Sequence, residues 1–315
     1  MNKKDYIVNF LLLIFAVISF IFLFNYFGGK NYSNKVVNIV FTTDINYKDY
    51  LKTTIRSAID HKKNDTVYNI NILCVDMPKQ EIDKFKKFNG ENVNINPIPI
   101  NLKSIRHVGN YKISYTVTRA DLFKFFMPAL FPNLDKILYI DVDTVILGDL
   151  RNLYNTDIRG KYIGVVNKCL KDHSTRYLYK KYYYTKRARF YNCGVMLYNL
   201  DLWRKHDITD KLVEQKNKAI EKRLMTQNVF NVVIPLNKTR RLSPVNNIFT
   251  QWNNPKFNRM LFFFAYPQYC FNGCDFNKLV ERGVIMHYLD DNKPWTYRDR
   301  AESEYWLIYE RKDDY

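Results

Sequence analysis

Cysteine and histidine are scarce in this chain, with five of each among 315 residues. The cysteines are scattered and odd in number, unlike the framework of a small disulfide-bonded protein. No two cysteines have the two-residue spacing of a structural zinc site, and the few histidines also argue against one. We therefore expect thiols that are buried or lie in loops, and Cys270 and Cys274 could pair or stay free.

Acidic residues are outnumbered by basic ones, 31 against 49, which leaves a formal net charge of +18. Such a charge attracts polyanions, including nucleic acids, anionic lipid headgroups, acidic glycans and diphosphates. The chain lacks zinc-finger spacing, heptads and the aromatic motif of common RNA-binding domains. We therefore expect no nucleic-acid partner.

Long disordered tracts and internal repeats are also missing. Hydrophobic residues make up 47% of the chain and charged residues 25%, which is ordinary for a globular protein. A chain of this length can bury a sizeable core, so we expect one large catalytic domain.

One long apolar run lies near the N-terminus. Residues 6–27 (YIVNFLLLIFAVISFIFLFNYF) contain only Asn9, Ser19 and Asn25 as clearly polar residues. A helix of this length can cross a bilayer of roughly 30 Å, and no small-residue cleavage site follows it. We expect an uncleaved single-pass anchor over residues 1–27 and a linker over 28–35. Lysines flank both ends, so the side of the membrane on which the remaining chain lies stays open.

From residue 36 onward, short apolar runs alternate with helical patterns. The β-branched run at 36–43 is followed by apolar residues at helical spacing over 50–59. This alternation predicts an α/β fold with parallel strands. A helix near 117–127 is expected to end around Pro128. Further strands are predicted near 68–75, 92–98, 136–140, 161–166, 193–198 and 284–288, and further helices from residue 78 and near 208–223 and 225–233.

Asp141 and Asp143 directly follow the apolar strand predicted at 136–140. In an extended chain, residues i and i+2 point to the same side, so both carboxylates can hold one divalent cation. The sequence DVDTV also resembles the nucleophile motif of haloacid-dehalogenase-type phosphatases, which leaves a second enzyme class open. That motif belongs on the first strand of its domain, whereas another strand and the loop that begins near Asp44 precede it here.

Four ordered blocks stand out: 36–47 (VVNIVFTTDINY), 136–147 (KILYIDVDTVIL), 190–206 (FYNCGVMLYNLDLWRKH) and 286–295 (MHYLDDNKPW). Together they resemble glycosyltransferase family 8, which includes glycogenin and bacterial lipooligosaccharide galactosyltransferases. The resemblance implies a GT-A fold, that is, a Rossmann-like mixed central sheet flanked by helices, over residues 36–315. It also implies a UDP-sugar donor, Mn²⁺ and transfer with retention of anomeric configuration.

The resemblance makes Asp141, Asp143 and His287 the metal ligands. An imidazole joining two carboxylates favours a transition metal such as Mn²⁺ over Mg²⁺. A lone histidine at a strand end is more often structural, but Lys293 follows six residues later in the sequence KPW. By the resemblance, Lys293 contacts the donor diphosphate and neutralises charge as UDP leaves.

The resemblance also assigns residues to the donor. Thr42, Asp44 and Asn46 match the nucleoside-binding stretch, although Asp44 could instead cap the following helix. Asn192 and Gly194 match an NxG segment, in which the amide faces the donor sugar and the glycine allows close backbone approach.

By the resemblance, Gln227 matches a glutamine near the reacting anomeric carbon, where its carbonyl could stabilise positive charge. Three other positions depart from the family pattern. Thr226 and Asn228, the neighbours of Gln227, replace aspartates, which disfavours a carboxylate nucleophile there. Lys124 replaces an arginine and keeps the charge without the planar fork. Asn192, Gln227 and Lys124 are the expected catalytic residues, and a weakly active or inactive sugar-nucleotide-binding protein is the alternative.

The segment 168–191 mixes basic and aromatic residues between two of the family blocks. We expect a loop near the acceptor, where aromatic faces stack on sugars and basic groups pair with anions. A solvated basic insertion is the alternative. The sequence thus predicts transfer of a hexose or related sugar from a UDP-sugar to a membrane-associated glycan or glycolipid, which could be acidic.

Overall fold

The computed structural model describes residues 34–101, 103, 119–168, 190–218, 226–250, 276–289 and 293–310. Contacts divide the chain into two compact units, residues 1–34 and 35–315, and the fold below is that of the second. Within the described ranges, no helix has the length and apolar character needed to cross a bilayer. The predicted anchor over 1–27 and the basic stretch 169–189 lie outside the described residues.

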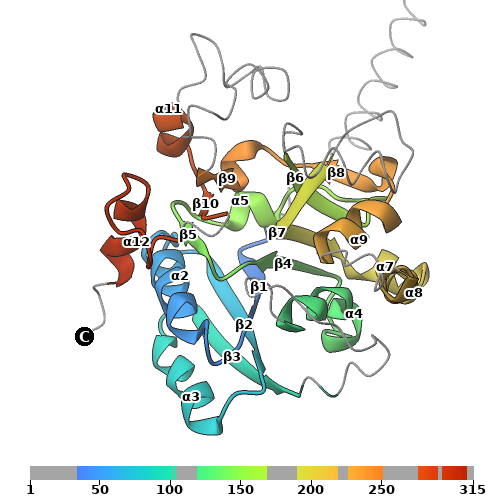
Figure 1. Ribbon diagram of the computed structural model, residues 1–315, viewed down its shortest axis with the longest axis horizontal. Helices are drawn as coiled ribbons and strands as arrows, with labels where there is room; N and C mark the ends of the chain where they lie inside the picture. The colour runs from blue at the N-terminus through green and yellow to red at the C-terminus, as the bar shows by residue number, and fades with distance from the viewer. Residues whose placement is uncertain are drawn as a thin grey trace, which may run out of the picture. The chain divides into compact units, whose positions relative to one another are not determined.

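A seven-stranded mixed sheet forms the centre of this unit. Its strands are β1 (Val36–Thr43), β2 (Val67–Val75), β3 (Val93–Ile100), β4 (Lys136–Ile140), β6 (Ile163–Lys168), β7 (Phe190–Asn199) and β8 (Thr239–Arg241). Their order across the sheet is β3-β2-β1-β4-β7-β6-β8, as Figure 1 shows. The first four strands along the chain are parallel, whereas β7 is antiparallel to both β4 and β6.

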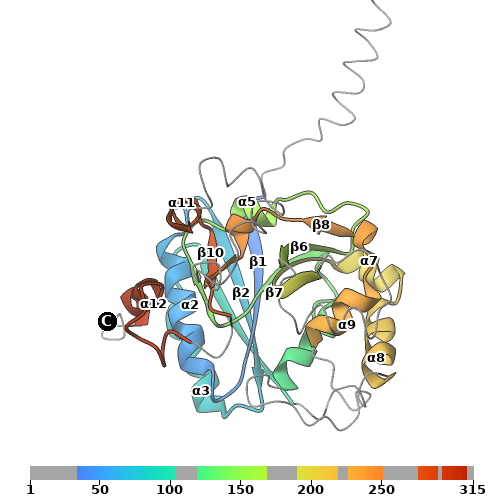
Figure 2. The ribbon, with the colours of Figure 1, turned by 45° about the horizontal axis from the view of Figure 1, so that its top comes forward.

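Helices cover both faces of the sheet. They are α2 (Lys48–Asp60), α3 (Lys79–Asp83), α4 (Met127–Leu130), α5 (Arg151–Tyr154), α7 (Leu200–Lys205), α8 (Ile208–Lys218), α9 (Thr226–Val233), α11 (Phe276–Glu281) and α12 (Ser303–Glu310). Short 3₁₀ helices are η1 (Lys84–Phe88), η3 (Arg119–Phe125), η5 (Leu236–Lys238) and η6 (Pro244–Asn246). Figures 1 and 2 show α2, α3 and α12 on one side and α4, α7, α8 and α9 on the other.

The covering of both faces explains the continuous apolar run of β4. Leu138 and Ile140 belong to the core under α2, while Ile137 and Tyr139 belong to the core under α4 and α9. A strand that is buried on both faces carries apolar residues at every position instead of alternating them with polar ones. The end of β4 is therefore firmly held where Asp141 begins.

A small three-stranded sheet brings distant parts of the chain together. Its strands are β5 (Thr144–Ile146), β9 (Ile248–Phe249) and β10 (Ile285–His287), in the order β5-β10-β9. Only residues 141–143 separate β4 from β5. Because β10 pairs antiparallel with β5, His287 lies opposite Thr144, next to the two aspartates.

The strands predicted from residue 36 onward are confirmed, with small shifts of their ends. The helix predicted near 117–127 was wrong in form, since its described part is the 3₁₀ helix η3. Pro128 does not end it but lies in the first turn of α4, where a missing N–H costs no helical hydrogen bond. The helix predicted over 208–223 is described as far as Lys218.

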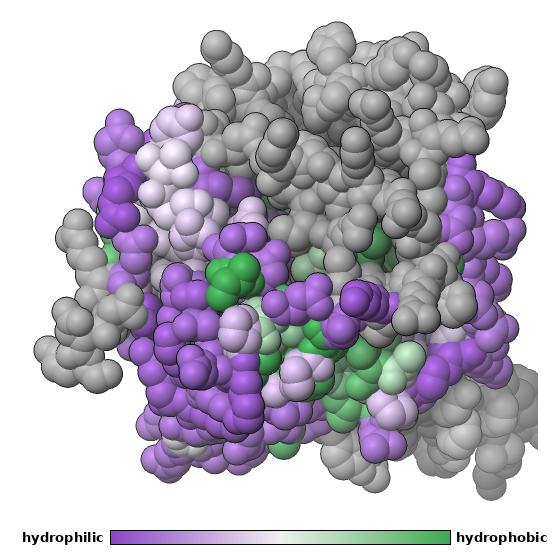
Figure 3. All heavy atoms as spheres, turned by 60° about the horizontal axis from the view of Figure 1, so that its bottom comes forward, coloured by the Kyte–Doolittle hydropathy of each residue, from purple (hydrophilic) through white to green (hydrophobic). Residues whose placement is uncertain are grey.

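Hydrophilic side chains dominate the described part of the face drawn in Figure 3, with smaller hydrophobic areas near its centre. Among the described residues, exposed large hydrophobic side chains are scattered over several elements: Ile45, Leu236, Tyr297 and Ile308. Single exposed hydrophobic residues of this kind are normal on protein surfaces and do not indicate a docking site.

Candidate active site

The site lies where β4 ends beside β7. Because the two strands are antiparallel, the N-terminal half of β7 lies next to the carboxyl end of β4. The backbone N–H of Asp141 donates to the carbonyl oxygen of Gly194 at 2.7 Å. Asn192 and Gly194 are therefore brought beside Asp141, although they are distant in sequence.

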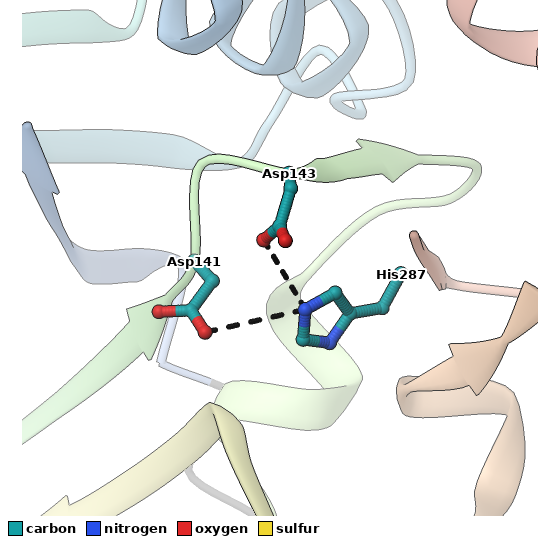
Figure 4. Close-up of side chains that lie close together, drawn as sticks. All are labelled: Asp141, Asp143 and His287. Atoms are coloured by element: carbon teal, nitrogen blue, oxygen red, sulfur yellow. Dashed lines mark ion pairs between the residues drawn. The ribbon is translucent and has the colours of Figure 1, made fainter. Parts of the chain in front are cut away.

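Asp141, Asp143 and His287 converge at this point, and Figure 4 shows their side chains pointing toward one another. Nε2 of His287 lies 3.2 Å from Oδ1 of Asp143 and 4.0 Å from Oδ2 of Asp141. One ligand atom from each residue lies within 4.8 Å of the others, a spacing that could hold a metal ion. The backbone N–H of Tyr288 donates to the Asp143 carbonyl at 3.0 Å, which fixes β10 against the aspartates.

Each aspartate directs one oxygen to this group and pairs the other with a lysine. Oδ1 of Asp141 accepts from the Tyr139 hydroxyl at 2.9 Å and lies 2.9 Å from Nζ of Lys124. Oδ2 of Asp143 accepts from Nζ of Lys293 at 2.6 Å. The outer oxygens are thus neutralised, while the inner oxygens face the histidine ring.

These neighbours shift the pKa values of the two aspartates in opposite directions. Burial raises the pKa of Asp141, Lys124 opposes this shift, and Asp143 adds to it. Burial also disfavours the Asp143 anion, but Lys293 and His287 outweigh it and hold the pKa of Asp143 far below its usual range. Asp143 is therefore the more firmly ionised carboxylate, and Asp141 depends on Lys124 for its charge.

Lys124 is buried, with 4% of its side chain exposed, and bridges two carboxylates. Its Nζ lies 2.5 Å from Oδ1 of Asp121 and 4.9 Å from the centre of the Tyr139 ring. Burial alone would lower the pKa of Lys124, but Asp121 and Asp141 hold it well above its ordinary value. Sequence reasoning found Lys124 but missed Asp121, which lies one turn earlier on η3 and belongs to no recognised motif.

Asn192 and Gln227 are joined by a hydrogen bond from Nδ2 of Asn192 to Oε1 of Gln227 at 3.0 Å. The backbone N–H of Cys193 donates to the same oxygen at 3.1 Å, so both lone pairs of that carbonyl are used. This differs from the expectation that the Gln227 carbonyl would face a sugar. Sequence reasoning also missed Asn247, whose side chain contacts both Asn192 and His287 at 3.0 Å.

The donor-binding residues predicted after β1 lie at its carboxyl end. Thr42 is buried, and its hydroxyl has no hydrogen-bond partner within the described ranges. Oδ1 of Asp44 accepts from the backbone N–H groups of Asn46 at 2.9 Å and Tyr47 at 3.2 Å. Asp44 therefore shapes the turn before α2 and does not cap this helix, whose N-cap residue is Tyr47. The Asp44 carboxylate retains further acceptor capacity. Asn46 is exposed.

The loop from Lys293 to Trp295 is held against α2. The Trp295 ring stacks on Tyr50 with centroids 3.8 Å apart, and Pro294 is buried. Nζ of Lys293 donates to the carbonyl oxygen of Tyr288 at 2.6 Å in addition to its bond with the aspartate. The ammonium group is thus fixed beside Asp143, one of the three candidate metal ligands.

The residues present fit a divalent cation. Two carboxylate oxygens and one imidazole nitrogen form a mixed set that suits a transition metal, and further positions remain for a substrate. A Cβ at Gly194 would lie 2.1 Å from Cε1 of His287 and 2.7 Å from Oδ2 of Asp141. The glycine therefore leaves room for the histidine to approach the aspartates.

Most of the chain matches a known protein family: the sequence profile of glycosyl transferase family 8 covers residues 38–299. The chain belongs to this family. The predicted family and the predicted enzyme class, a glycosyltransferase, are therefore confirmed. The phosphatase alternative for the DVDTV sequence is excluded.

Two relatives of this family 8 glycosyltransferase come from Streptococcus pneumoniae. Glycosyltransferase GlyF is 25% identical over 88% of the chain, and glycosyltransferase GlyA is 27% identical over 86%. The chain spans 62% of the length of GlyF and 34% of the length of GlyA.

The fold is also similar to that of a solved structure, the galactosyltransferase LgtC in complex with donor and acceptor sugar analogues. The TM-score is 0.70 at 20% identity, over 87% of this chain and 95% of LgtC. At this identity the likeness concerns the fold, and it agrees with the predicted mixed α/β architecture of the GT-A type.

Proposed function

We propose that this family 8 glycosyltransferase moves a hexose or related sugar from a UDP-sugar to a membrane-associated glycan or glycolipid, with retention of anomeric configuration and with Mn²⁺. The observation that carries the proposal is the convergence of Asp141, Asp143 and His287 beside the ammonium group of Lys293. This arrangement offers a cation site and a separate positive group at one strand end, which suits a diphosphate.

Charge balance supports a diphosphate ligand. Without a cation, the three carboxylates of Asp121, Asp141 and Asp143 face the two ammonium groups of Lys124 and Lys293. A bound divalent cation makes this cluster positive and stabilises the negative charge of the leaving UDP. Lys293 would then bind a diphosphate oxygen, because its ammonium group has three donors and its bonds to Asp143 and Tyr288 use two of them.

The positions of the other predicted donor-binding residues suggest a role for each of them. The buried Thr42 hydroxyl, which has no hydrogen-bond partner among the described residues, and the Asp44 carboxylate would bind the nucleoside, with exposed Asn46 at the edge. Gly194 and Asn192 would border the donor sugar, because they lie next to Asp141 on β7. Mn²⁺ is the proposed ion because imidazole joins two carboxylates in the ligand set.

A membrane location is proposed from the sequence. An anchor over residues 1–27 would hold the catalytic unit near a bilayer, and the net charge of +18 favours an anionic surface or an acidic acceptor. The basic segment 168–191 would contribute to either contact. Neutralising Lys180, Lys181, Lys186 and Arg187 should then weaken acceptor affinity or liposome binding, and no change in either would contradict this role.

The test of the reaction is UDP release. The purified protein would be incubated with a panel of UDP-sugars and Mn²⁺, with and without EDTA, alongside Asp143→Ala. Release from one donor that both EDTA and the substitution abolish is the expected result and would identify the sugar. If no UDP-sugar binds, the proposed donor class is wrong.

Thr226 favours a second candidate function, that of a weakly active or inactive sugar-nucleotide-binding protein. It is buried on α9 and offers no carboxylate beside Gln227. Metal-dependent donor binding without UDP release, with any acceptor tried, would favour this candidate over the transferase.

A further inference from the structure

Asn247 connects the predicted metal ligand to the predicted sugar site. It follows the 3₁₀ helix η6 and is fully buried. Its Oδ1 lies 3.0 Å from Nδ1 of His287, and its Nδ2 donates to Oδ1 of Asn192 at 3.0 Å. No motif in the sequence pointed to this residue, and the family resemblance assigned it no role.

Backbone donors fix the direction of these hydrogen bonds. The backbone N–H of Gly194 donates to Asn192 at 2.8 Å, and a backbone N–H can only donate, so the atom of Asn192 that accepts is its oxygen. The atom of Asn247 that contacts this oxygen must then be its NH₂ group. The oxygen of Asn247 is therefore the atom that faces Nδ1 of His287.

The direction of these hydrogen bonds determines that Nδ1 of the His287 ring carries a proton. An oxygen facing Nδ1 requires a proton on Nδ1, because two acceptors would repel each other. Nε2 is then the ring nitrogen left for a cation, which would replace any proton on it, and this nitrogen lies 3.2 Å from Oδ1 of Asp143. The backbone of β7 thus selects, through two side-chain amides, the histidine tautomer that can bind a cation.

The same reasoning extends to Gln227. The backbone N–H of Cys193 donates to Gln227 at 3.1 Å, so the accepting atom is Oε1, and Nδ2 of Asn192 donates to it as well. The NH₂ group of Gln227 is left pointing away from this network. In the part of the chain that the structure describes, no hydrogen bond engages it, and the side chain is partly exposed.

We propose that Asn247 is a positioning residue that sets the His287 tautomer for metal binding and, through Asn192, orients Gln227 so that its NH₂ group faces the donor sugar. The second half of this proposal depends on the proposed sugar transfer, whereas the first half depends only on metal binding. Partners that hydrogen-bond to the second nitrogen of a metal-ligating histidine typically change metal affinity by about 10- to 100-fold.

Two substitutions separate the two bonds of Asn247. Asn247→Leu has a similar size and removes both bonds. Asn247→Asp keeps an oxygen toward His287 but places a second oxygen against Oδ1 of Asn192, which Gly194 holds in place. Asn71→Leu is the matched control, because Asn71 is also a buried asparagine bonded to a neighbouring amide, but lies within the sheet on β2.

The first measurement is titration of the whole 315-residue chain in detergent with Mn²⁺ alone, in the absence of any nucleotide sugar. We expect Asn247→Leu to lower Mn²⁺ affinity about 10- to 100-fold and Asn247→Asp to retain it within a few-fold. We also expect Asn247→Asp to lower kcat for UDP release, because repulsion displaces Asn192 and leaves Gln227 with only the bond from the Cys193 N–H. Asn71→Leu should lower only the melting temperature.

The proposal is overturned if Asn247→Leu binds Mn²⁺ as tightly as the unmodified protein, or if Asn71→Leu weakens binding equally. Should Asn247→Leu fail to fold, the unmodified protein still provides a test. With five histidines in the chain, nitrogen-15 labelling and Zn²⁺ loading allow the His287 tautomer to be read by NMR. We expect a proton on Nδ1 and metal on Nε2, and the reverse would also overturn the proposal.

Failure of the proposed function gives a different result. If the unmodified protein binds Mn²⁺ but releases UDP from no donor, the transferase proposal fails while the tautomer and affinity measurements still decide the role of Asn247 toward His287. If these measurements agree with expectation but Asn247→Asp releases UDP with an unchanged kcat, the proposed orientation of Gln227 by Asn247 through Asn192 is overturned.

Discussion

Gly194 and His287 lie closer together than any other residue at position 194 would permit, since a Cβ there would lie 2.1 Å from Cε1 of the ring. Gly194→Ala must therefore push the ring away from Asp141 and Asp143, because the backbone at Gly194 is held against β4 by the hydrogen bond from the Asp141 N–H at 2.7 Å. We expect Mn²⁺ affinity to fall about 10-fold or more, as for other losses of metal-site geometry. Titration with Mn²⁺ would measure the change.

Gly90→Ala is the matched control for this substitution. A Cβ at Gly90 would meet no atom within 4 Å, so the same chemical change causes no clash there. Gly90→Ala should leave Mn²⁺ affinity unchanged. Equal affinities for Gly194→Ala and Gly90→Ala would show that the ring can move without loss of the metal site.

Lys124 neutralises two carboxylates, and its removal should cost stability. Lys124→Met leaves Asp121 and Asp141 without their shared cation in a largely buried position. We expect the free energy of unfolding to fall by about 3 kcal/mol, the order found when one partner of a buried ion pair is removed. Urea unfolding with and without Mn²⁺ would measure it, and Mn²⁺ should recover part of the loss by giving Asp141 a new partner.

Lys124→Arg provides the comparison, because it restores the residue that the family resemblance implies. Its charge remains, so we expect a smaller loss of stability than for Lys124→Met. If Lys124→Met were as stable as Lys124→Arg, the two ion pairs would contribute little, and the role given to Lys124 would be wrong.

The long strands and the acidic pair could be predicted because each carries a local signal. β4 is apolar throughout since both of its faces are buried, and Asp141 and Asp143 follow where the strand ends. The parallel order of the first strands follows from the alternation of strands and helices.

The rest of the site depends on contacts that no local pattern reveals. β5 and β9 are only two or three residues long, too short for any periodicity. β10 was predicted near 284–288, but its pairing with β5, which brings His287 to the aspartates, has no local signal. The family resemblance supplied His287, but Asn247 and Asp121 are ordinary polar residues in sequence. They became visible only through the hydrogen bonds and ion pairs of the folded chain.

Lys216 on α8 should make stability depend on pH. The side chain is fully buried, and burial lowers the pKa of Lys216 to about 8, although Asp121 opposes the shift. In the unfolded chain a lysine has a pKa of about 10.4, so between pH 8 and 10 the unfolded state binds more protons. Stability relative to Lys216→Met should therefore rise over this window, by up to about 3 kcal/mol.

Lys211→Met is the control on the same helix, because Lys211 is exposed. Chemical denaturation at several pH values from 7 to 10 would give the difference for each variant. The difference in stability between the unmodified protein and Lys211→Met should not change with pH. If the difference from Lys216→Met were also independent of pH, burial would not disfavour the charged form of Lys216.

Lys293 should affect nucleotide and metal binding in opposite directions. Its Nζ lies 2.6 Å from Oδ2 of Asp143, so a cation bound there is repelled by the ammonium group, whereas a diphosphate is attracted to it. We expect Lys293→Gln to weaken UDP binding in the presence of Mn²⁺ by about 10-fold or more, since a hydrogen bond to a charged group contributes about 1.5–3 kcal/mol. Mn²⁺ affinity should be unchanged or higher.

Calorimetric titrations would measure both affinities, with Lys84→Gln as a control that removes the ion pair between exposed Lys84 on η1 and Glu81 on α3. Weaker binding of Mn²⁺ together with unchanged UDP affinity would instead make Lys293 a support for Asp143 and not a ligand of the diphosphate.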